Sequence, residues 1–275
     1  MKLAAVALAA LALATPARLS PLDTAAGYLT ARQQAGGGFA EPDEAADPSL
    51  TAWVVLALRA ANRELPDGTA EYLERQPYPT ANDLALRILA LRLLGRDVDA
   101  LADTLDSLRR PDGRIGPLVN STAWGVIALR AAGRTAPTAS VRYLLARQHA
   151  GGGWSWAPRG GPDSNDTAAV VQALRSAGTR GRPIERGLAY LRRLQAPGGG
   201  FRLVTGRAPD AQSTAWAVQA YLAAGKKPPR AALAFLISLR RADGSFRYSR
   251  RYATTPAIVT AQVVPALAGK PFPLR

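Results

Sequence analysis

Most of this 275-residue chain consists of six copies of one two-part motif. The second part of the motif is the clearer one, because five copies begin with Thr-Ala and continue as a mostly apolar segment. Equivalent first positions are residues 51, 84, 122, 167, 214 and 260, at spacings of 33, 38, 45, 47 and 46 residues. Repeats of this length are typical of architectures in which one supersecondary unit is stacked on itself. The chain is therefore predicted to be an array of six equivalent units.

The first part of the motif predicts an amphipathic helix followed by a glycine turn. Four copies read YLTARQQAGGGF (28–39), YLLARQHAGGGW (143–154), YLRRLQAPGGGF (190–201) and FLISLRRADGSF (235–246). Apolar residues recur at helical spacing with arginines between them, which leaves one face in water. Glycine allows the positive backbone angles that helix ends require, so this helix is predicted to stop at Gly-Gly-Gly or Asp-Gly-Ser.

The second part of the motif predicts a helix that must be enclosed. It follows Ser, Asp or Thr, which cap free amide groups, and it is apolar nearly all round. Six hairpins that each combine a half-exposed and an enclosed helix close naturally into a double ring. The predicted fold is all-α, a single α6/α6 toroid with the enclosed helices inside. An open solenoid is the competing geometry, disfavoured because neither chain end has a polar capping repeat.

The first 17 residues have the features of a secretory signal peptide. Lys2 precedes a run of 12 apolar residues, Leu3 to Ala14, and Thr15-Pro16-Ala17 supplies small residues for cleavage. Such a run spans about 18 Å as a helix, short of the roughly 30 Å of a bilayer core, so a retained anchor is the weaker alternative. The expected organisation is a signal peptide (1–17), a toroid (22–269) and a C-terminal tail (270–275). The protein is expected to be secreted or held in the cell envelope, and soluble after cleavage.

The composition excludes several kinds of site. With no cysteine and one histidine, thiolate chemistry and multi-histidine metal sites cannot be built, so no metal and no cofactor are expected. His149 precedes a glycine turn and is expected to be a solvated loop residue. The net charge is +15, but basic residues recur singly or in pairs and no nucleic-acid-binding motif occurs. Nucleic acid is not an expected partner, whereas a weak, salt-sensitive attraction to anionic membranes or polymers is compatible with the charge.

A glutamine, a glycine turn and Phe or Trp, followed by Ser-Thr-Ala-Trp, resemble the repeats of terpenoid cyclases and protein prenyltransferases. This α/α toroid family includes squalene-hopene cyclase, and the resemblance covers residues 22–269. It implies that the glutamines and aromatics brace the barrel; in this chain they are Gln33, Gln148, Gln195, Phe39, Trp154 and Phe201. The zinc site of the prenyltransferases requires a cysteine and cannot be assembled here.

The resemblance also points to one candidate catalytic segment. Class II terpenoid cyclases protonate an alkene with an Asp-x-Asp-Asp motif, and residues 163–166 read Asp-Ser-Asn-Asp. Asn165 stands where the family has its acid and has no proton to donate. Asp163 and Asp166 are the candidate substitutes. The alternative is structural: Asp166 caps the following helix and Asp163 lies in the loop before it.

Four tryptophans are candidate ligand-binding residues. Trp53, Trp124 and Trp216 hold the same position in three units, and Trp156 lies in an irregular loop. The other units have Leu86, Ala169 and Gln262 at this position. The ring of side chains is therefore uneven, and a pocket is expected on the Ala169 side. The tryptophans either fill the core of the barrel or line the mouth of a binding site.

Three functions follow as hypotheses. The first is an exported, non-catalytic toroid that binds a small apolar, amphipathic or isoprenoid-like ligand, or a protein partner, at the rim of the inner helices. The second is a reduced class II isoprenoid cyclase that uses Asp163 and Asp166. The third is a carbohydrate-active double barrel, because some glycosidases combine this architecture with two carboxylates. Fold alone does not decide among them.

Overall fold

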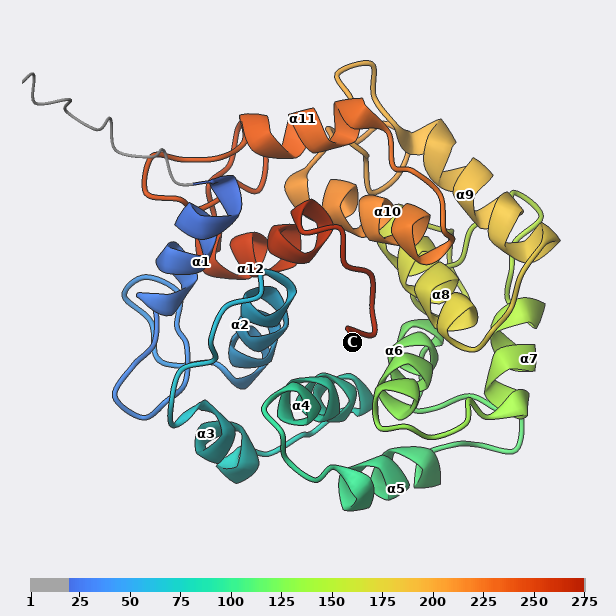
Figure 1. Cartoon of the computed structure of the whole chain (residues 1–275). Helices are drawn as coiled ribbons and strands as arrows, with labels where there is room; N and C mark the ends of the chain where they lie inside the picture. Colours follow the sequence, from blue (N-terminus) through green and yellow to red (C-terminus); the bar gives the residue numbers. More distant parts are fainter. Residues whose placement is uncertain (1–19, 275) are drawn as a thin grey trace, which may run out of the picture.

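A computed structural model describes residues 20–274, so the predicted signal peptide at 1–17 lies outside the described residues. This part of the chain forms twelve α-helices in two concentric rings (Figure 1). The inner ring is α2 (Pro48–Ala60), α4 (Ala81–Leu93), α6 (Val119–Ala131), α8 (Ser164–Ser176), α10 (Ala211–Ala223) and α12 (Pro256–Leu267). The outer ring is α1 (Pro21–Thr30), α3 (Thr69–Arg75), α5 (Asp99–Ser107), α7 (Thr138–Ala146), α9 (Arg182–Leu194) and α11 (Arg230–Ser238). The all-α toroid of six helical hairpins is confirmed. None of the described helices is both long and apolar enough to cross a membrane.

The inner ring is closed. Each inner helix packs on the next, and α12 packs on α2. At this seam the Glu41 carboxylate accepts hydrogen bonds of 2.8 Å from the backbone amides of Ala257 and Ile258. A side chain from the first unit therefore caps the last inner helix, and the open solenoid is excluded.

The glycine turns lie beyond the ends of the outer helices, which corrects the expectation that the helices stop at glycine. Helix α1 ends at Thr30, and the chain then forms a tight turn. A 2.8 Å hydrogen bond from the backbone N–H of Gln34 to the Gly38 carbonyl closes this turn. Gly37 has a φ of +88°, and a Cβ atom there would lie 2.1 Å from the Gly68 carbonyl oxygen. Glycine is needed because this turn presses against the start of the next outer helix. Equivalent close contacts involve Gly113, Gly152, Gly199 and Gly244.

One hydrogen bond joins the two rings in five of the six units. The Phe201 amide donates to the Thr214 hydroxyl at 2.9 Å, and the Phe201 side chain is fully buried between the rings. Equivalent bonds join Phe39 to Thr51, Ile115 to Thr122, Trp154 to Thr167 and Phe246 to Thr260. Two of the glutamines brace the outer ring: Gln148 Nε2 donates to the Pro183 carbonyl at the start of α9, and Gln33 Nε2 donates to the Asp67 carbonyl before α3, both at 2.8 Å. Gln195 Nε2 donates to the Gly199 carbonyl of its own turn. The threonine of each Thr-Ala pair thus fixes a glycine turn to an inner helix.

Replacing this threonine tests the link between the rings. Thr214→Val keeps the shape of the side chain but leaves the buried Phe201 amide without an acceptor, so the free energy of unfolding should fall by about 1–3 kcal/mol. Thr104→Val, on an exposed position of α5, should change it by less than about 0.5 kcal/mol. Chemical denaturation measures both. Equal effects of the two substitutions would contradict the assigned role.

Candidate functional site

The amino ends of four inner helices are joined by polar side chains, and we call this end of the barrel the N-terminal rim. Ser49 on α2 donates to Asp83 on α4 at 3.4 Å. Next to Asp83, the Asn82 amide donates to Asn120 on α6 at 2.8 Å, and Asn120 donates to Asp166 on α8 at 2.6 Å. Neither asparagine was predicted from the sequence to be a site residue. Both lie in the first turn of equivalent inner helices, two residues before the first position of their repeat, and this shared place is the sequence signal for their pairing.

The two candidate catalytic aspartates have different roles in this rim. Asp163 is the N-cap of α8, and its carboxylate accepts the Asp166 amide at 2.8 Å. The expectation that Asp166 is the cap is therefore wrong, because Asp166 lies inside the first turn, where its side chain turns toward α6. Asp166 is 4% exposed. Asn165 is half-buried and accepts a 3.1 Å bond from the Ser164 hydroxyl.

Burial favours the protonated form of the Asp166 carboxyl. Loss of water around the carboxyl, together with the neighbouring Asp163, raises the pKa of Asp166 to about 8. A carboxyl with a raised pKa is neutral at pH 7 and is a weaker acid than an ordinary aspartic acid. A general acid must hold its proton at the working pH, and this shift gives Asp166 that property. Among residues 20–274 no three His, Asp or Glu side chains converge as a metal site.

Three of the candidate tryptophans fill the centre of the barrel. Trp53, Trp124 and Trp216 are 4–7% exposed, and their ring centroids lie 5.4–5.9 Å apart. The C-terminal tail adds Phe272, whose ring lies 5.8 Å from both Trp53 and Trp124. The Phe272 amide donates to Gln172 of α8 at 2.9 Å. These four aromatic rings form what we call the hub, and they are packed against one another rather than lining an open mouth.

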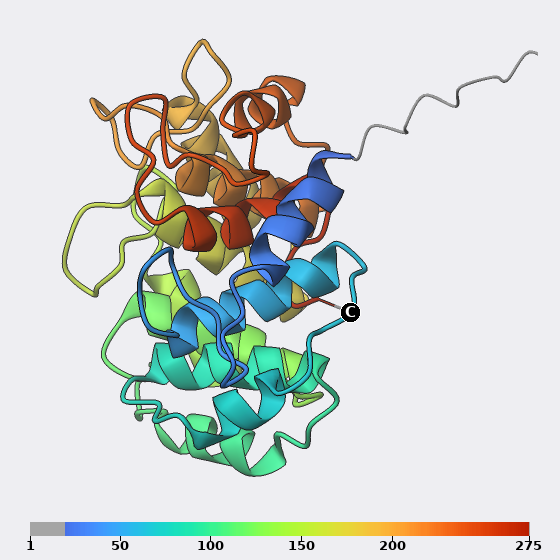
Figure 2. The ribbon, with the colours of Figure 1, turned by 90° about the vertical axis from the view of Figure 1, so that its left-hand side faces the viewer.

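The tail enters the hub from the end of the barrel opposite the N-terminal rim. Figure 1 shows the chain end inside the ring, and Figure 2 shows it on the side away from the long connecting loops. Gln172 lies one turn after Ala169 on α8, so the tail is bonded to an inner helix whose repeat has alanine in place of tryptophan. Phe272 could not be predicted from the repeats because the tail lies outside them.

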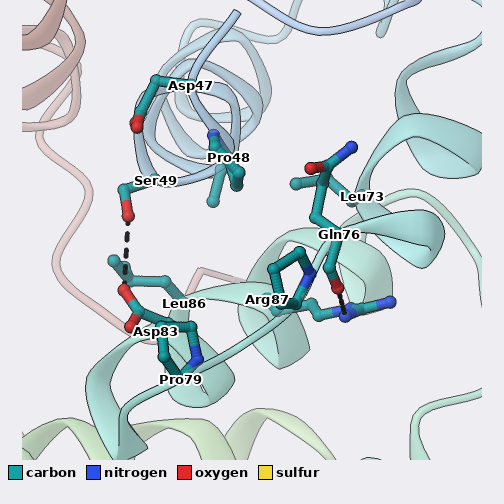
Figure 3. A pocket seen from close by; sticks show the side chains of 11 residues that line it. Asp47, Pro48, Ser49, Leu73, Gln76, Pro79, Asp83, Leu86 and Arg87 are labelled. Carbon is teal, nitrogen blue, oxygen red and sulfur yellow. Dashed lines mark hydrogen bonds between the residues drawn. The ribbon is translucent and has the colours of Figure 1, made fainter.

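A cavity does open at the N-terminal rim, beside Leu86 rather than Ala169 as expected. It measures about 250 Å³ and lies between α2, α4 and the end of α3 (Figure 3). Its lining is Asp47, Pro48, Ser49, Ala52, Leu73, Gln76, Pro77, Pro79, Asp83, Leu86 and Arg87. Leu86 occupies the position that tryptophan holds in three other units, and a half-buried leucine leaves more space there.

The candidate residue Trp156 and the single histidine, His149, lie away from this cavity. The Trp156 side chain is 56% exposed, while its carbonyl accepts the amides of Val119 and Asn120 at 3.1 and 3.2 Å and so caps α6. His149 is half-buried, with Nε2 3.4 Å from the Ser155 hydroxyl. Neither residue lines the cavity beside Leu86.

Comparison with known proteins identifies the fold. No model of a protein family and no curated protein matches the sequence. Among solved structures, a protein from Actinoplanes superposes with a TM-score of 0.70 at 18% identity, covering 90% of this chain and 98% of that one. The type II terpene cyclase MstE from Scytonema gives 0.67 at 16% identity, covering 90% and 96%, and a glycosidase gives 0.61 at 14%, covering 91% and 97%. The chain has the α/α toroid fold that type II terpene cyclases have, and identities this low show the fold alone.

The raised pKa of Asp166 makes stability depend on pH. Between the unfolded pKa near 4 and the folded pKa near 8, the folded state holds a proton that the unfolded state has lost, so stability falls as pH rises. Asp166→Asn removes this proton, and its melting temperature should exceed that of the wild type by a margin that grows from pH 5 to pH 8. Asp163→Asn keeps a capping side chain and removes only the smaller contribution of the neighbouring carboxylate to the pKa of Asp166, so its margin should grow much less with pH. A margin for Asp166→Asn that stays constant with pH would show that Asp166 is ionised in the fold.

The docking of the tail is tested at Phe272. Phe272→Ala removes a buried ring from the hub and should lower the free energy of unfolding by about 3 kcal/mol. Tryptophan fluorescence should shift to longer wavelength, because the three hub indoles gain contact with water. Leu274→Ala, at a half-buried position two residues later, is the control and should leave the emission unchanged. An unchanged spectrum for Phe272→Ala would contradict the assigned packing.

Proposed function

We propose that this protein is a non-catalytic toroid that binds a small amphipathic ligand in the cavity beside Leu86. The cavity itself is the observation that carries the proposal, since it combines apolar walls with a few polar groups at one rim. Its volume of about 250 Å³ is just below the roughly 300–1,000 Å³ of sites for drug-sized ligands. The ligand is therefore small, or only part of it is enclosed.

The lining supports a ligand with an apolar body and a hydrogen-bond-donating head. Pro48, Ala52 and Leu86 supply apolar surface. Asp47 accepts the Leu50 amide and Asp83 accepts from Ser49 and Thr80, and each carboxylate has further acceptor positions for a ligand. A hydroxyl or ammonium head matches these acceptors.

Arg87 is part of the scaffold of this cavity. Its guanidinium donates to the carbonyls of Glu74 and Gln76 at the end of α3, and the residue is only 9% exposed. Burial lowers the pKa of Arg87. Because the head group is committed to the end of α3, we assign no ligand contact to it.

Filling the cavity tests the proposal. Leu86→Trp introduces the tryptophan that three other repeats have and adds volume at the cavity, whereas Leu86→Met keeps the volume. Binding of the fluorescent amine dansylcadaverine to the whole protein should weaken at least about tenfold in Leu86→Trp, a loss of about 1.4 kcal/mol, and less than about twofold in Leu86→Met. No binding by the wild type, or equal binding by both variants, would overturn the proposal.

The second candidate function is a reduced isoprenoid cyclase. It is favoured by the shared fold with the type II terpene cyclase MstE and by the alignment of Asp163 and Asp166 with the family motif. Against it stand Asn165 at the position of the acid, the burial of Asp166 and the filled hub. Incubation with squalene or a prenyl diphosphate should give no cyclised product. A product that disappears in Asp166→Asn would replace the binding proposal with this one.

A carbohydrate-active function has weaker support. One solved structure of the same fold is a glycosidase, and that chemistry needs two carboxylates that a sugar can reach. Asp166 is buried and Asp163 is occupied as a helix cap. We expect no release of reducing sugar from polysaccharides, and release that depends on either aspartate would favour this third function.

Export remains part of the proposal. Lys2 and the apolar run up to Ala14 support a cleaved signal peptide. Amino-terminal sequencing of the protein recovered from its native host should begin after Ala14 or Ala17. An intact Met1 would count against export by this route.

A further inference from the structure

The carboxyl ends of the inner helices carry a repeated arginine that the proposed function does not use. We call this end of the barrel the C-terminal rim. Arg59, Arg92, Arg130 and Arg175 each lie eight residues after the first position of their repeat, on four consecutive inner helices. Arginine near a helix carboxyl end is favourable in general, because unpaired carbonyls give that end a partial negative charge.

Two of these arginines have a structural task. Arg130 Nε donates to the Ser176 carbonyl of α8 at 3.1 Å, and Arg175 Nε donates to the Ala223 carbonyl of α10 at 3.0 Å. In both arginines Nη1 also donates at 2.8 Å to a carbonyl of the loop that follows the same helix. Each side chain thus ties the end of its helix to the next inner helix.

Arg59 and Arg92 depart from this pattern. Between residues 20 and 274 neither side chain donates a hydrogen bond or pairs with a carboxylate, and both are exposed. Elsewhere on the surface, by contrast, Arg96 and Arg134 pair with acidic side chains. The repeat therefore places two guanidinium groups at the C-terminal rim without the structural bonds that their equivalents make.

These two arginines face a common cavity together with Arg130. The cavity measures about 440 Å³, and its lining includes no acidic side chain. Leu93, Ala131, Pro273 and Leu274 supply its apolar surface. A second hollow adjoins it at Arg59 and Leu274, where Lys270 adds a cation and Glu64 an acid.

We propose that this cavity binds a phosphate group carried on an apolar body. The planar guanidinium fork matches the geometry of phosphate oxygens, and a phosphate carries enough charge to engage more than one arginine. The apolar body packs on Leu93 and Leu274. Two sources share this chemistry: a soluble phosphate ester and the headgroup of a phospholipid. The site lies at the opposite end of the barrel from the cavity beside Leu86, so the two proposals stand independently.

The experiment uses the whole protein and two probes. Calorimetry at fixed ionic strength measures binding of inorganic diphosphate, and co-sedimentation measures binding to vesicles of phosphatidylglycerol and phosphatidylcholine against vesicles of phosphatidylcholine alone. The test variant is the double substitution Arg59→Gln and Arg92→Gln, which breaks no hydrogen bond among the described residues. The control, Arg110→Gln with Arg142→Gln, removes the same charge from exposed positions of the outer layer.

We expect the test variant to bind at least about tenfold more weakly than the control, whose affinity should stay within about twofold of the wild type. A loss seen in calorimetry identifies a soluble phosphate ligand, and a loss confined to the anionic vesicles identifies a lipid headgroup. The proposal is overturned if the wild type binds neither probe, or if the test and control variants weaken equally, since a general effect of net charge then explains the binding.

Discussion

The hydrogen bond from a buried backbone amide to the hydroxyl of the Thr-Ala pair holds this protein together as two rings. In Phe201 and Thr214 it joins a glycine turn of the outer layer to an inner helix, and the aromatic side chain fills the space between them. The same glycine turn presses against the next outer helix, so one contact positions three elements. Because the unit recurs around the ring, the last unit meets the first, and Glu41 caps α12 across the seam. Both ends of the barrel exist only because this ring closes.

Because the inner helices run in the same direction around the closed ring, the two ends of the barrel carry side chains of opposite charge. At the N-terminal rim the amide ends of the inner helices attract carboxylates, such as Asp163 and Asp210, which cap them. At the C-terminal rim the carbonyl ends attract arginines, such as Arg130 and Arg175. One cavity adjoins Leu86 with carboxylates, and the other adjoins Arg92 with guanidinium groups.

The repeats were enough to predict the toroid, its closure and the enclosed position of the Thr-Ala helices, because each unit carries the same pattern of burial. Features that depend on how units meet could not be read from one unit. The pairing of Asn120 with Asp166 joins side chains 46 positions apart, and the turn at Gly37 is set by contact with Gly68 rather than by the preceding helix. Phe272 belongs to no repeat, yet its ring packs on Trp53 and Trp124 and completes the hub.

Native-state hydrogen exchange measures the closed ring most directly. The amides of Phe39 and Phe246, in the first and last units, should exchange with the same free energy as those of Trp154 and Phe201, because in a sealed ring every such bond opens only when the whole barrel unfolds. If the amides of the first and last units exchange at clearly lower free energy than the central ones, the repeats form an array that frays from its ends. That result would contradict the closed barrel.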